Sequence, residues 1–463
     1  MTENMQQLLF ERSQLTNIRV YFIGIGGIGM SALARFFHQN GAIVSGYDRH
    51  RSELCQKLET EGIKIHYEDS LELLDKKADI VIYTPAIPKE MHELNFYKDN
   101  GYKLMKRSEI LQWITEGTFN VCIGGTHGKS TITSLVSHIL RDSQFGCNAF
   151  LGAISVNYGT NFWKDEHAVS VVEADEYDRS FLRLSPNVAV ITAMDADHLD
   201  IYGTLENVQQ AFIDFSKRIR PEGCLIVKKG LAKEQELVAD NKFTYSFNDV
   251  SADYRAENLR VENGSYIYDV VTPTGTIKDI TLHLGGIHNI ENSLAAIAVS
   301  QFVKIEESLI RNAIASFRGV KRRFEYLIKD NKHVLIDDYA HHPEELRALL
   351  EGVKTLYKQK IVAVFQPHLY TRTRDLADGF AKSLDIADEV ILLPIYPARE
   401  LPIEGVDSQL ILDKMTIQNK RVLSKDEVIA TIQSENPPLL VMCGAGDIDE
   451  LIPIVKKELE NNI

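Results

Sequence analysis

The sequence has few cysteines, and no two of them have the spacing of a metal site. Five cysteines occur in 463 residues, scattered along the chain and never as Cys-x-x-Cys. An odd, scattered set argues against a disulfide framework and against a structural zinc site. The chain is therefore expected to work in a reducing compartment, and the cytoplasm is the expected location.

Long apolar runs are also missing. No stretch approaches the roughly 20 apolar residues that a membrane-spanning helix needs. Residues 1–14 carry acidic side chains and lack the apolar segment of a signal peptide. The sequence therefore predicts a soluble intracellular globular protein with no membrane partner.

The chain has fewer basic residues than acidic ones. The chain has 51 Lys and Arg against 65 Asp and Glu, which leaves a net charge of −14. Proteins that bind nucleic acids or membrane surfaces need a basic footprint, so neither kind of partner is expected. Local basic clusters still allow anionic small molecules as substrates. No segment of the sequence indicates an obligatory protein partner.

Three blocks of alternating strands and helices are predicted. A domain typically holds about 100–200 residues, so the length of 463 residues suggests three domains. Short apolar runs between helix-like segments predict Rossmann-like α/β domains over residues 1–117 and 319–463. Residues 118–318 are predicted to form a central α/β domain. Turn signals at 262–264 and 272–275 add antiparallel hairpins to that domain within 254–284.

A phosphate-binding loop is the most informative motif of the chain. The apolar run 119–123 precedes Gly124-Gly125-Thr126-His127-Gly128-Lys129-Ser130, and a helix-like segment follows. Backbone N–H groups of such a loop close around phosphate oxygens, the lysine adds a charge, and the serine hydroxyl can hold Mg²⁺. Ile123 stands where the common pattern has glycine, so the loop is a shortened variant. The motif predicts a P-loop domain that binds ATP; the alternative is a glycine-rich turn that only starts a helix.

An earlier glycine loop, Gly24-Ile25-Gly26-Gly27-Ile28-Gly29, follows the first predicted strand and opens a helix. Asp48 ends the second predicted strand, where a Rossmann unit places a ribose-binding acid. The pattern predicts a dinucleotide-type fold but leaves the ligand open, because NAD and a UDP-sugar both suit the same helix N-terminus. A glycine turn needed only for close packing of strand and helix is the alternative.

Acidic residues follow two predicted strands of the central block. The run 173–178 follows the strand 169–172, and the run 195–200 follows the strand 188–192. The carboxyl ends of such strands face the ligand crevice, so both runs should converge on the phosphate loop. Glu173 is the predicted Mg²⁺ ligand, since Mg²⁺ prefers carboxylate and phosphate oxygens. His198 is a candidate ligand of a second metal ion, and a solvated acidic loop is the alternative for either run.

Further polar motifs begin helices or follow strands in the rest of the chain. Asn289 starts a helix, where an asparagine is often only a cap. The basic cluster 319–325 suits contact with phosphate, or forms a solvated turn. His341 and His342 are adjacent and rarely could share one ion, so hydrogen bonding to a ligand is preferred to metal binding. Arginines after residue 366 suit carboxylate or phosphate groups.

Taken in order, these motifs resemble those of the Mur ligases over nearly the whole chain. The resemblance rests on residues 24–29, 125–130, 173–176, 197–198, 288–292, 322–325, 338–343 and 366–368. It implies an ATP- and Mg²⁺-dependent ligase of peptidoglycan precursor synthesis. The first domain would bind a UDP-sugar rather than NAD, the second ATP, and the third an amino acid. The expected reaction joins L-alanine to the lactoyl carboxylate of UDP-N-acetylmuramate through an acyl phosphate.

The resemblance also assigns roles to individual residues. The catalytic residues would be Lys129, Glu173, His198 and Arg323. The Mg²⁺ ligands would be Ser130, Glu173 and His198. The ATP-binding residues would be Gly125, Thr126, His127, Gly128, Lys129, Ser130, Thr131, Asn289, Asn292, Arg323 and Asp338. The residues that bind the UDP-sugar or the amino acid would be Gly26, Gly27, Ile28, Gly29, Asp48, His341, His368 and Arg372.

Two departures from the family pattern bear on the substrate. Residues 210–213 contain no lysine where relatives that add later residues often carry a carbamylated one, which favours alanine addition. Leu369 stands where some relatives have arginine. The alternative within the family adds a whole tripeptide to the same nucleotide sugar. Outside it, an NAD-dependent dehydrogenase would leave the phosphate loop unexplained, and a non-catalytic nucleotide switch would bind ATP without turnover.

Overall fold

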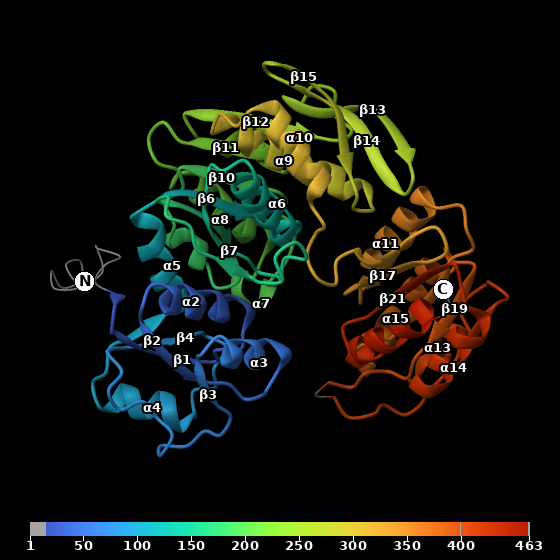
Figure 1. The fold of residues 1–463 in the computed structure, drawn as a ribbon, viewed down its shortest axis with the longest axis horizontal. Coiled ribbons are helices and arrows are strands. Elements are labelled where there is room, and N and C mark those ends of the chain that lie inside the picture. Colours follow the sequence, from blue (N-terminus) through green and yellow to red (C-terminus); the bar gives the residue numbers. More distant parts are fainter. Residues whose placement is uncertain (1–14, 399, 462–463) are drawn as a thin grey trace. The chain divides into compact units, whose positions relative to one another are not determined.

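A computed structural model of the chain, drawn in Figure 1, describes residues 15–398 and 400–461. The segment in which no signal peptide is expected, residues 1–14, lies outside this part. The described strands form three sheets. Contacts divide the chain into two compact units, one of residues 1–255, 271–275 and 292–313, the other of 256–270, 276–291 and 314–463.

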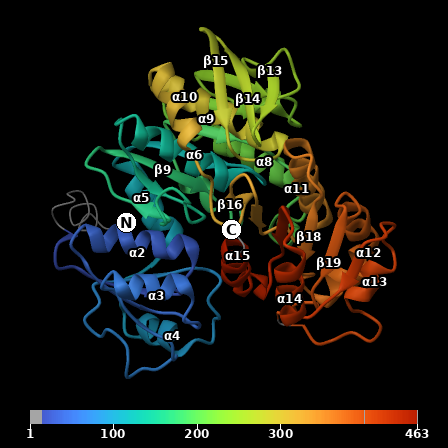
Figure 2. The ribbon, with the colours of Figure 1, turned by 45° about the vertical axis from the view of Figure 1, so that its right-hand side comes forward.

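The first sheet is parallel, with strand order β3-β2-β1-β4-β5. Its strands are β1 (Arg19–Ile23), β2 (Ile43–Tyr47), β3 (Lys64–His66), β4 (Ile80–Tyr83) and β5 (Leu104–Lys106). Its helices are α2 (Ile28–Gln39), α3 (Glu53–Thr60), α4 (His92–Asp99) and α5 (Arg107–Glu116). Val20 and Phe22 pack with residues of α2, whereas Tyr21 and Ile23 pack with Tyr97 of α4. Because side chains alternate along a strand, the two helices cover opposite faces; Figure 2 shows α2 and α3 side by side.

The central sheet has the order β15-β14-β13-β12-β11-β10-β6-β9-β7-β8. Its strands are β6 (Phe119–Gly124), β7 (Asn148–Phe150), β8 (Phe162–Trp163), β9 (Val169–Ala174), β10 (Val188–Ile191), β11 (Cys224–Lys228), β12 (Asn241–Ser246), β13 (Tyr254–Glu262), β14 (Ser265–Thr272) and β15 (Gly275–Leu282). The helices are α6 (Lys129–Asp142), α7 (Leu199–Tyr202), α8 (Leu205–Ser216), α9 (Ile287–Phe302) and α10 (Glu307–Ser316). Strand β6 lies between β9 and β10 and is parallel to both, so the three carboxyl ends are neighbours.

The turn residues between β13, β14 and β15 confirm the predicted hairpins. Asn263 and Gly264 join β13 to β14 and have φ angles of 49° and 66°. Positive φ at both central positions belongs to the two-residue type I′ turn, whose twist matches that of antiparallel strands. Pro273 and Thr274 join β14 to β15, and neither of them has a positive φ angle.

The third sheet has the order β16-β17-β21-β18-β19-β20, with only β16 antiparallel. Its strands are β16 (Glu325–Lys329), β17 (Val334–Asp338), β18 (Val362–Phe365), β19 (Glu389–Leu392), β20 (Lys420–Val422) and β21 (Leu439–Cys443). Its helices are α11 (Pro343–Leu356), α12 (Tyr370–Leu384), α13 (Ser408–Leu412), α14 (Lys425–Glu435) and α15 (Ile452–Asn461). The three sheets fall within the predicted domains 1–117, 118–318 and 319–463, whose limits stay predictions.

Cysteine pairing and long apolar helices, which the sequence does not predict, can be compared with the structure. All five cysteines are buried free thiols. Among the residues that the structure describes, no helix combines the length and the apolar character needed to cross a membrane. The predicted α/β class, with parallel sheets and some antiparallel strands, is confirmed.

Candidate active site

The phosphate loop joins β6 to α6, as predicted. Gly125 and Gly128 have φ angles of 131° and 81°, a region that favours glycine. Gly128 is the N-cap of α6, which begins at Lys129. The first N–H groups of a helix have no partner within it, and they carry the positive end of its dipole. Lys129, Ser130 and Thr131 therefore lie where a phosphate group would be bound.

A buried carboxylate holds Lys129. The lysine Nζ donates hydrogen bonds to Glu176 Oε1 and Oε2, at 2.8 and 2.9 Å, and to the carbonyl oxygen of Gly125 at 2.7 Å. The Glu176 side chain is 1% exposed. Burial raises the pKa of Glu176, and the charge of Lys129 opposes that rise. The sequence places Glu176 in the acidic run but gives no reason to single it out.

Glu173 is the last residue but one of β9 and lies next to the start of α6. Its Oε1 accepts a hydrogen bond from the N–H of Gly152 at 2.8 Å, and Ser130 is a second hydrogen-bond partner. Burial raises the pKa of Glu173, and these hydrogen bonds together with Lys129 oppose the rise. The structure thus brings together Ser130 and Glu173, two of the three predicted Mg²⁺ ligands. Both offer oxygen atoms, which are the ligands that Mg²⁺ prefers.

His198, the third predicted ligand, lies with a different pair of carboxylates. Donor atoms of Glu176, Asp197 and His198 all lie within 4.8 Å of one another. Asp195 also approaches the phosphate loop, with Oδ2 at 3.5 Å from the hydroxyl of Thr126. Both acidic runs therefore converge on the loop, as expected for residues that follow strands on either side of β6. Glu176 and Asp197 are absent from the predicted ligand set.

The remaining residues predicted to bind ATP around the loop have different surroundings. His127 is exposed, and its Nε2 lies 3.7 Å from Asp195 Oδ2. The Asn292 side-chain oxygen lies 2.9 Å from the position that a Cβ on Gly128 would take, so α9 contributes to the surroundings of the loop. Asn289 donates from its side chain to the backbone carbonyl four residues earlier, at 2.7 Å. That contact supports the local structure at the start of α9.

The first glycine loop lies at the carboxyl end of β1, where the strand order changes direction between β1 and β4. Such a switch point is where open α/β sheets bind ligands. Helix α2 begins at Ile28 with Gly27 as its N-cap. Asp48 Oδ2 accepts a hydrogen bond from the N–H of Gly26 at 2.8 Å. Asp48 therefore holds the loop itself, and its contact with a substrate stays a prediction.

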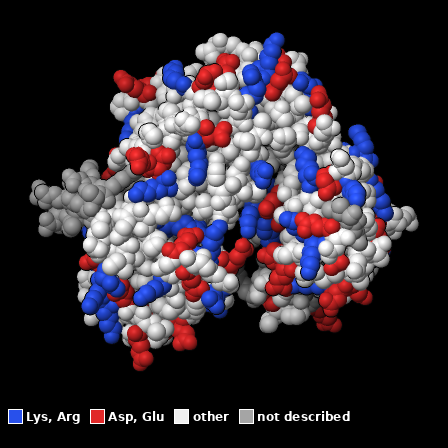
Figure 3. Space-filling view, viewed as in Figure 1, with Lys and Arg blue, Asp and Glu red and all other residues white. Residues whose placement is uncertain are grey.

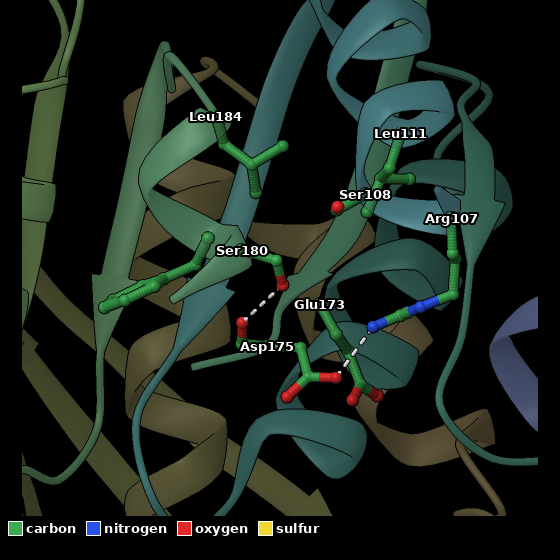
Figure 4. A pocket seen from close by; sticks show the side chains of 8 residues that line it. Arg107, Ser108, Leu111, Glu173, Asp175, Ser180 and Leu184 are labelled. Atoms are coloured by element: carbon green, nitrogen blue, oxygen red, sulfur yellow. Dashed lines mark hydrogen bonds and ion pairs between the residues drawn. The ribbon is translucent and has the colours of Figure 1, made fainter. Parts of the chain in front are cut away.

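Arg107, the first residue of α5, connects this loop with the acidic run. Its Nη2 donates to Asp175 Oδ2 at 2.7 Å, and its Nη1 lies 2.8 Å from the position of a Cβ on Gly29. Figure 4 shows Arg107 reaching across a small pocket toward Asp175, with Glu173 beside them. Arg107 is not predicted from the sequence, because one arginine at a helix start belongs to no motif.

Asp338 supports the backbone around the basic cluster of the second unit. Its Oδ2 accepts from the N–H of Phe324 and its Oδ1 from that of Ala340, each at 2.7 Å. Burial raises the pKa of Asp338 to about 6, and Arg323 is among the groups that oppose the rise. Asp338 thus fixes the loop that carries Arg323. The contact of Asp338 with ATP stays a prediction.

The residues predicted to bind the amino acid lie after β17 and β18. The rings of His341 and His368 are 6.1 Å apart, centre to centre, and Tyr396 stacks on His368 at 5.7 Å. Nη1 of Arg372 is buried and has no hydrogen-bond partner among the described residues. Leu369 has a φ of 73°, which is rare for a branched side chain. The structure therefore gathers His341 and His368, and the contact of Arg372 with a substrate stays a prediction.

Three family descriptions match the chain in sequence order. Residues 19–118 match the Mur ligase family catalytic domain, and residues 123–300 match the Mur ligase middle domain. Residues 322–446 match the glutamate ligase domain of the Mur ligases. The chain belongs to the Mur ligase family. The motifs from which the sequence predicted this family are spread over all three matched segments.

Named relatives of this Mur ligase cover almost its full length. The UDP-N-acetylmuramate–L-alanine ligase of Flavobacterium johnsoniae is 47% identical over 449 residues, which are 96% of this chain and 98% of that protein. The enzyme of the same name from Phocaeicola vulgatus is 47% identical, covering 94% and 96%.

Solved structures agree with the fold. The crystal structure of UDP-N-acetylmuramate–alanine ligase from Thermotoga maritima has a TM-score of 0.81 and 27% identity, covering 96% of this chain and 99% of that one. A murein peptide ligase from Psychrobacter arcticus has a TM-score of 0.65 and 22% identity, covering 96% and 100%. The second likeness shows the fold alone.

Proposed function

We propose that this Mur ligase joins L-alanine to the lactoyl carboxylate of UDP-N-acetylmuramate and uses ATP to activate that carboxylate. The observation that carries the proposal is the 47% identity, over nearly the whole chain, to two relatives named UDP-N-acetylmuramate–L-alanine ligase. The phosphate loop at the start of α6 supports a nucleoside triphosphate as a substrate. The tripeptide-adding alternative has less support, since the murein peptide ligase is only 22% identical.

The reaction needs activation because a carboxylate is a poor acylating agent. The γ-phosphoryl group of ATP would pass to a carboxylate oxygen of the sugar, with ADP as the leaving group. The amine of L-alanine would then attack the acyl carbon, lose a proton and displace inorganic phosphate, which leaves an amide. No side-chain nucleophile is required, so catalysis depends on positioning and charge.

The chain has residues suited to positioning the substrates and to neutralising charge. Lys129 and Arg323 would neutralise charge on the transferring phosphoryl group, and the backbone N–H groups of the loop would orient it. Ser130 and Glu173 would hold one Mg²⁺ and His198 would hold a second, and the contact between Ser130 and Glu173 fits the first ion. The bound ion would supply positive charge beside the phosphate oxygens.

The other substrates are assigned from the location of the polar residues. The first glycine loop, with Gly26, Gly29 and Asp48, would bind the UDP part of the sugar nucleotide. His341, His368 and Arg372 would bind the amino acid or the muramoyl end. The proposed reaction requires only small molecules as partners. Because it uses ATP, we also propose that the protein works in the cytoplasm.

Mass spectrometry of the product tests the proposal directly. The protein is incubated with ATP, Mg²⁺, UDP-N-acetylmuramate and L-alanine, and the alanyl adduct is expected only when ATP is present. A parallel reaction contains the tripeptide in place of L-alanine. An adduct with the tripeptide alone would assign the chain to the recycling reaction, and no adduct from a folded protein that binds ATP would refute the proposed ligation.

A further inference from the structure

Glu176 takes up the hydrogen bonds of Lys129 that a nucleotide phosphate would need. Both carboxylate oxygens of Glu176 lie within 2.9 Å of the lysine Nζ, and the carbonyl oxygen of Gly125 lies at 2.7 Å. An ammonium group has three N–H donors, so these three acceptors use its full capacity. Lys129 can therefore bind a phosphate oxygen only after it releases one of these acceptors, and Glu176 supplies two of the three.

The carboxylate that Lys129 releases would stay inside the protein. The Glu176 side chain is 1% exposed, and the hydroxyl of Tyr202 donates to the Glu176 backbone carbonyl at 2.6 Å. A buried carboxylate that loses its cation is strongly destabilised. It needs another positive charge within reach.

The structure shows where such a charge could be bound. Donor atoms of Asp197 and His198 lie within 4.8 Å of a Glu176 oxygen and of each other. A second carboxylate cannot compensate the first, but a divalent cation held among these three side chains can. The same carboxylate can thus serve Lys129 in one state and a metal ion in another.

We infer that Glu176 is a positioning residue that exchanges partners when nucleotide binds. It holds Lys129 in the free enzyme, and it turns to the divalent cation when phosphate oxygens take Lys129. The inference rests on the proposed use of ATP with Mg²⁺. If Glu176 exchanges partners, nucleotide that binds without metal leaves a buried carboxylate without a cation. The metal–nucleotide complex brings the cation that Glu176 needs.

Calorimetric titration of ATP into the full chain tests the exchange, with Mg²⁺ and with EDTA. The replacement Glu176→Gln keeps the size of the side chain and removes its charge. The Glu176→Gln variant should bind metal-free ATP about tenfold more tightly than the parent does, a difference in binding free energy of roughly 1.4 kcal/mol. The matched control is Asp178→Asn, which removes the same charge from the same run; the Asp178 carboxylate accepts from the N–H of Ser180. The control should bind metal-free ATP as the parent does.

The outcomes separate the exchange from a structural role and from the proposed function. Equal affinity of the parent and Glu176→Gln for metal-free ATP would overturn the exchange, while binding of Mg·ATP to the parent would still support the proposed ATP site. A structural role alone would lower the melting temperature without any gain in affinity. If Glu176→Gln does not fold, Glu176→Asp, which withdraws the carboxylate by one methylene, should shift the affinity in the same direction, and an unchanged affinity would again contradict the inference.

The metal half of the exchange has its own measurement. Mn²⁺ is titrated into the ADP-bound chain and the free ion is followed by electron paramagnetic resonance. Glu176→Gln should weaken Mn²⁺ binding about tenfold relative to the parent and to Asp178→Asn, since a carboxylate ligand is lost. Equal Mn²⁺ affinity would show that Glu176 does not turn to the metal.

Discussion

Lys129 neutralises the buried carboxylate of Glu176 and, in the proposed reaction, the phosphoryl group in transfer. The replacement Lys129→Met should lower turnover by about 100-fold or more, because charge stabilisation in the transition state is lost. It should also lower the free energy of unfolding by on the order of 3 kcal/mol, because a buried carboxylate loses the cation that pairs with it. ADP release and denaturant unfolding measure the two effects.

A double replacement separates these two effects. Lys129→Met combined with Glu176→Gln removes both charges, so stability should return close to that of the parent while turnover stays low. Near-normal turnover of the single variant would refute the role of the loop lysine. Parent-like stability of the single variant would show that Glu176 does not depend on Lys129. The motif alone predicts the catalytic loss, and only the structure predicts the loss of stability.

Glu93 is another buried carboxylate, far in sequence from any motif. Its Oε2 accepts from the hydroxyl of Tyr21 at 2.5 Å, and its Oε1 accepts from the N–H of Ser70 at 3.3 Å. His66 Nε2 lies 3.6 Å from Oε1. Burial raises the pKa of Glu93 to about 7. The folded protein therefore holds a proton that the unfolded chain releases at lower pH.

This difference predicts how stability depends on pH. As pH rises from about 4.5 through about 7, the unfolded state ionises first, so the contribution of Glu93 to stability falls. Glu93→Gln should lose less stability than the parent between pH 5 and pH 8, by on the order of 2–3 kcal/mol. Unfolding curves across this range measure it, with the exposed Glu90→Gln as the control. Parallel pH dependences of parent and Glu93→Gln would contradict the prediction.

At the scale of elements, the first glycine loop illustrates two kinds of packing. A Cβ on Gly26 would lie 2.4 Å from the sulfur of Cys55, a buried residue of α3, and 2.9 Å from Asp48 Oδ2. The three atoms nearest to a Cβ on Gly29 would all belong to the Arg107 side chain, with Nη1 at 2.8 Å. A flexible arginine can move, whereas a buried helix cannot move without cost.

The two glycines should therefore respond differently to the same substitution. Gly26→Ala should destabilise the protein by about 1–3 kcal/mol through overpacking. Gly29→Ala should leave the melting temperature nearly unchanged but displace Arg107 from Asp175, and a higher KM for the sugar nucleotide is expected. Thermal unfolding and steady-state kinetics test the pair. Equal loss of stability in both variants would show that the loop, rather than the individual contact, is sensitive.

Elements with strong local signals were predictable, and short ones were not. The hairpin turn at Asn263 and Gly264 and the phosphate loop are specified by residues adjacent in sequence. Strand β8 has two residues, and its neighbour Asn161 donates to the carbonyl of Ile28 at 2.6 Å and to Ser31 Oγ at 2.9 Å. Contacts between residues that lie more than 100 positions apart leave no periodic pattern, so this packing on α2 could not be predicted.

At the scale of the molecule, charge is abundant but mixed. On the face seen in Figure 3, basic and acidic side chains lie among one another. With a net charge of −14 the chain should not bind duplex DNA, because phosphate neutralisation supplies most of such binding. Fluorescence anisotropy of a labelled duplex at low salt measures this. Micromolar affinity that falls steeply with salt would contradict the expectation.

The sequence by itself determined the α/β class and the family, and it predicted the residues that would meet phosphate. Glycines, a lysine and acidic residues at strand ends indicate these features directly, because their chemistry is local and their order along the chain is fixed. Tertiary structure alone decided which acid pairs with which cation. Glu176 rather than Glu173 holds Lys129, and Asp175 holds Arg107, because pairing depends on distances between separate elements. Burial then decides how strongly each of these pairs affects stability and binding.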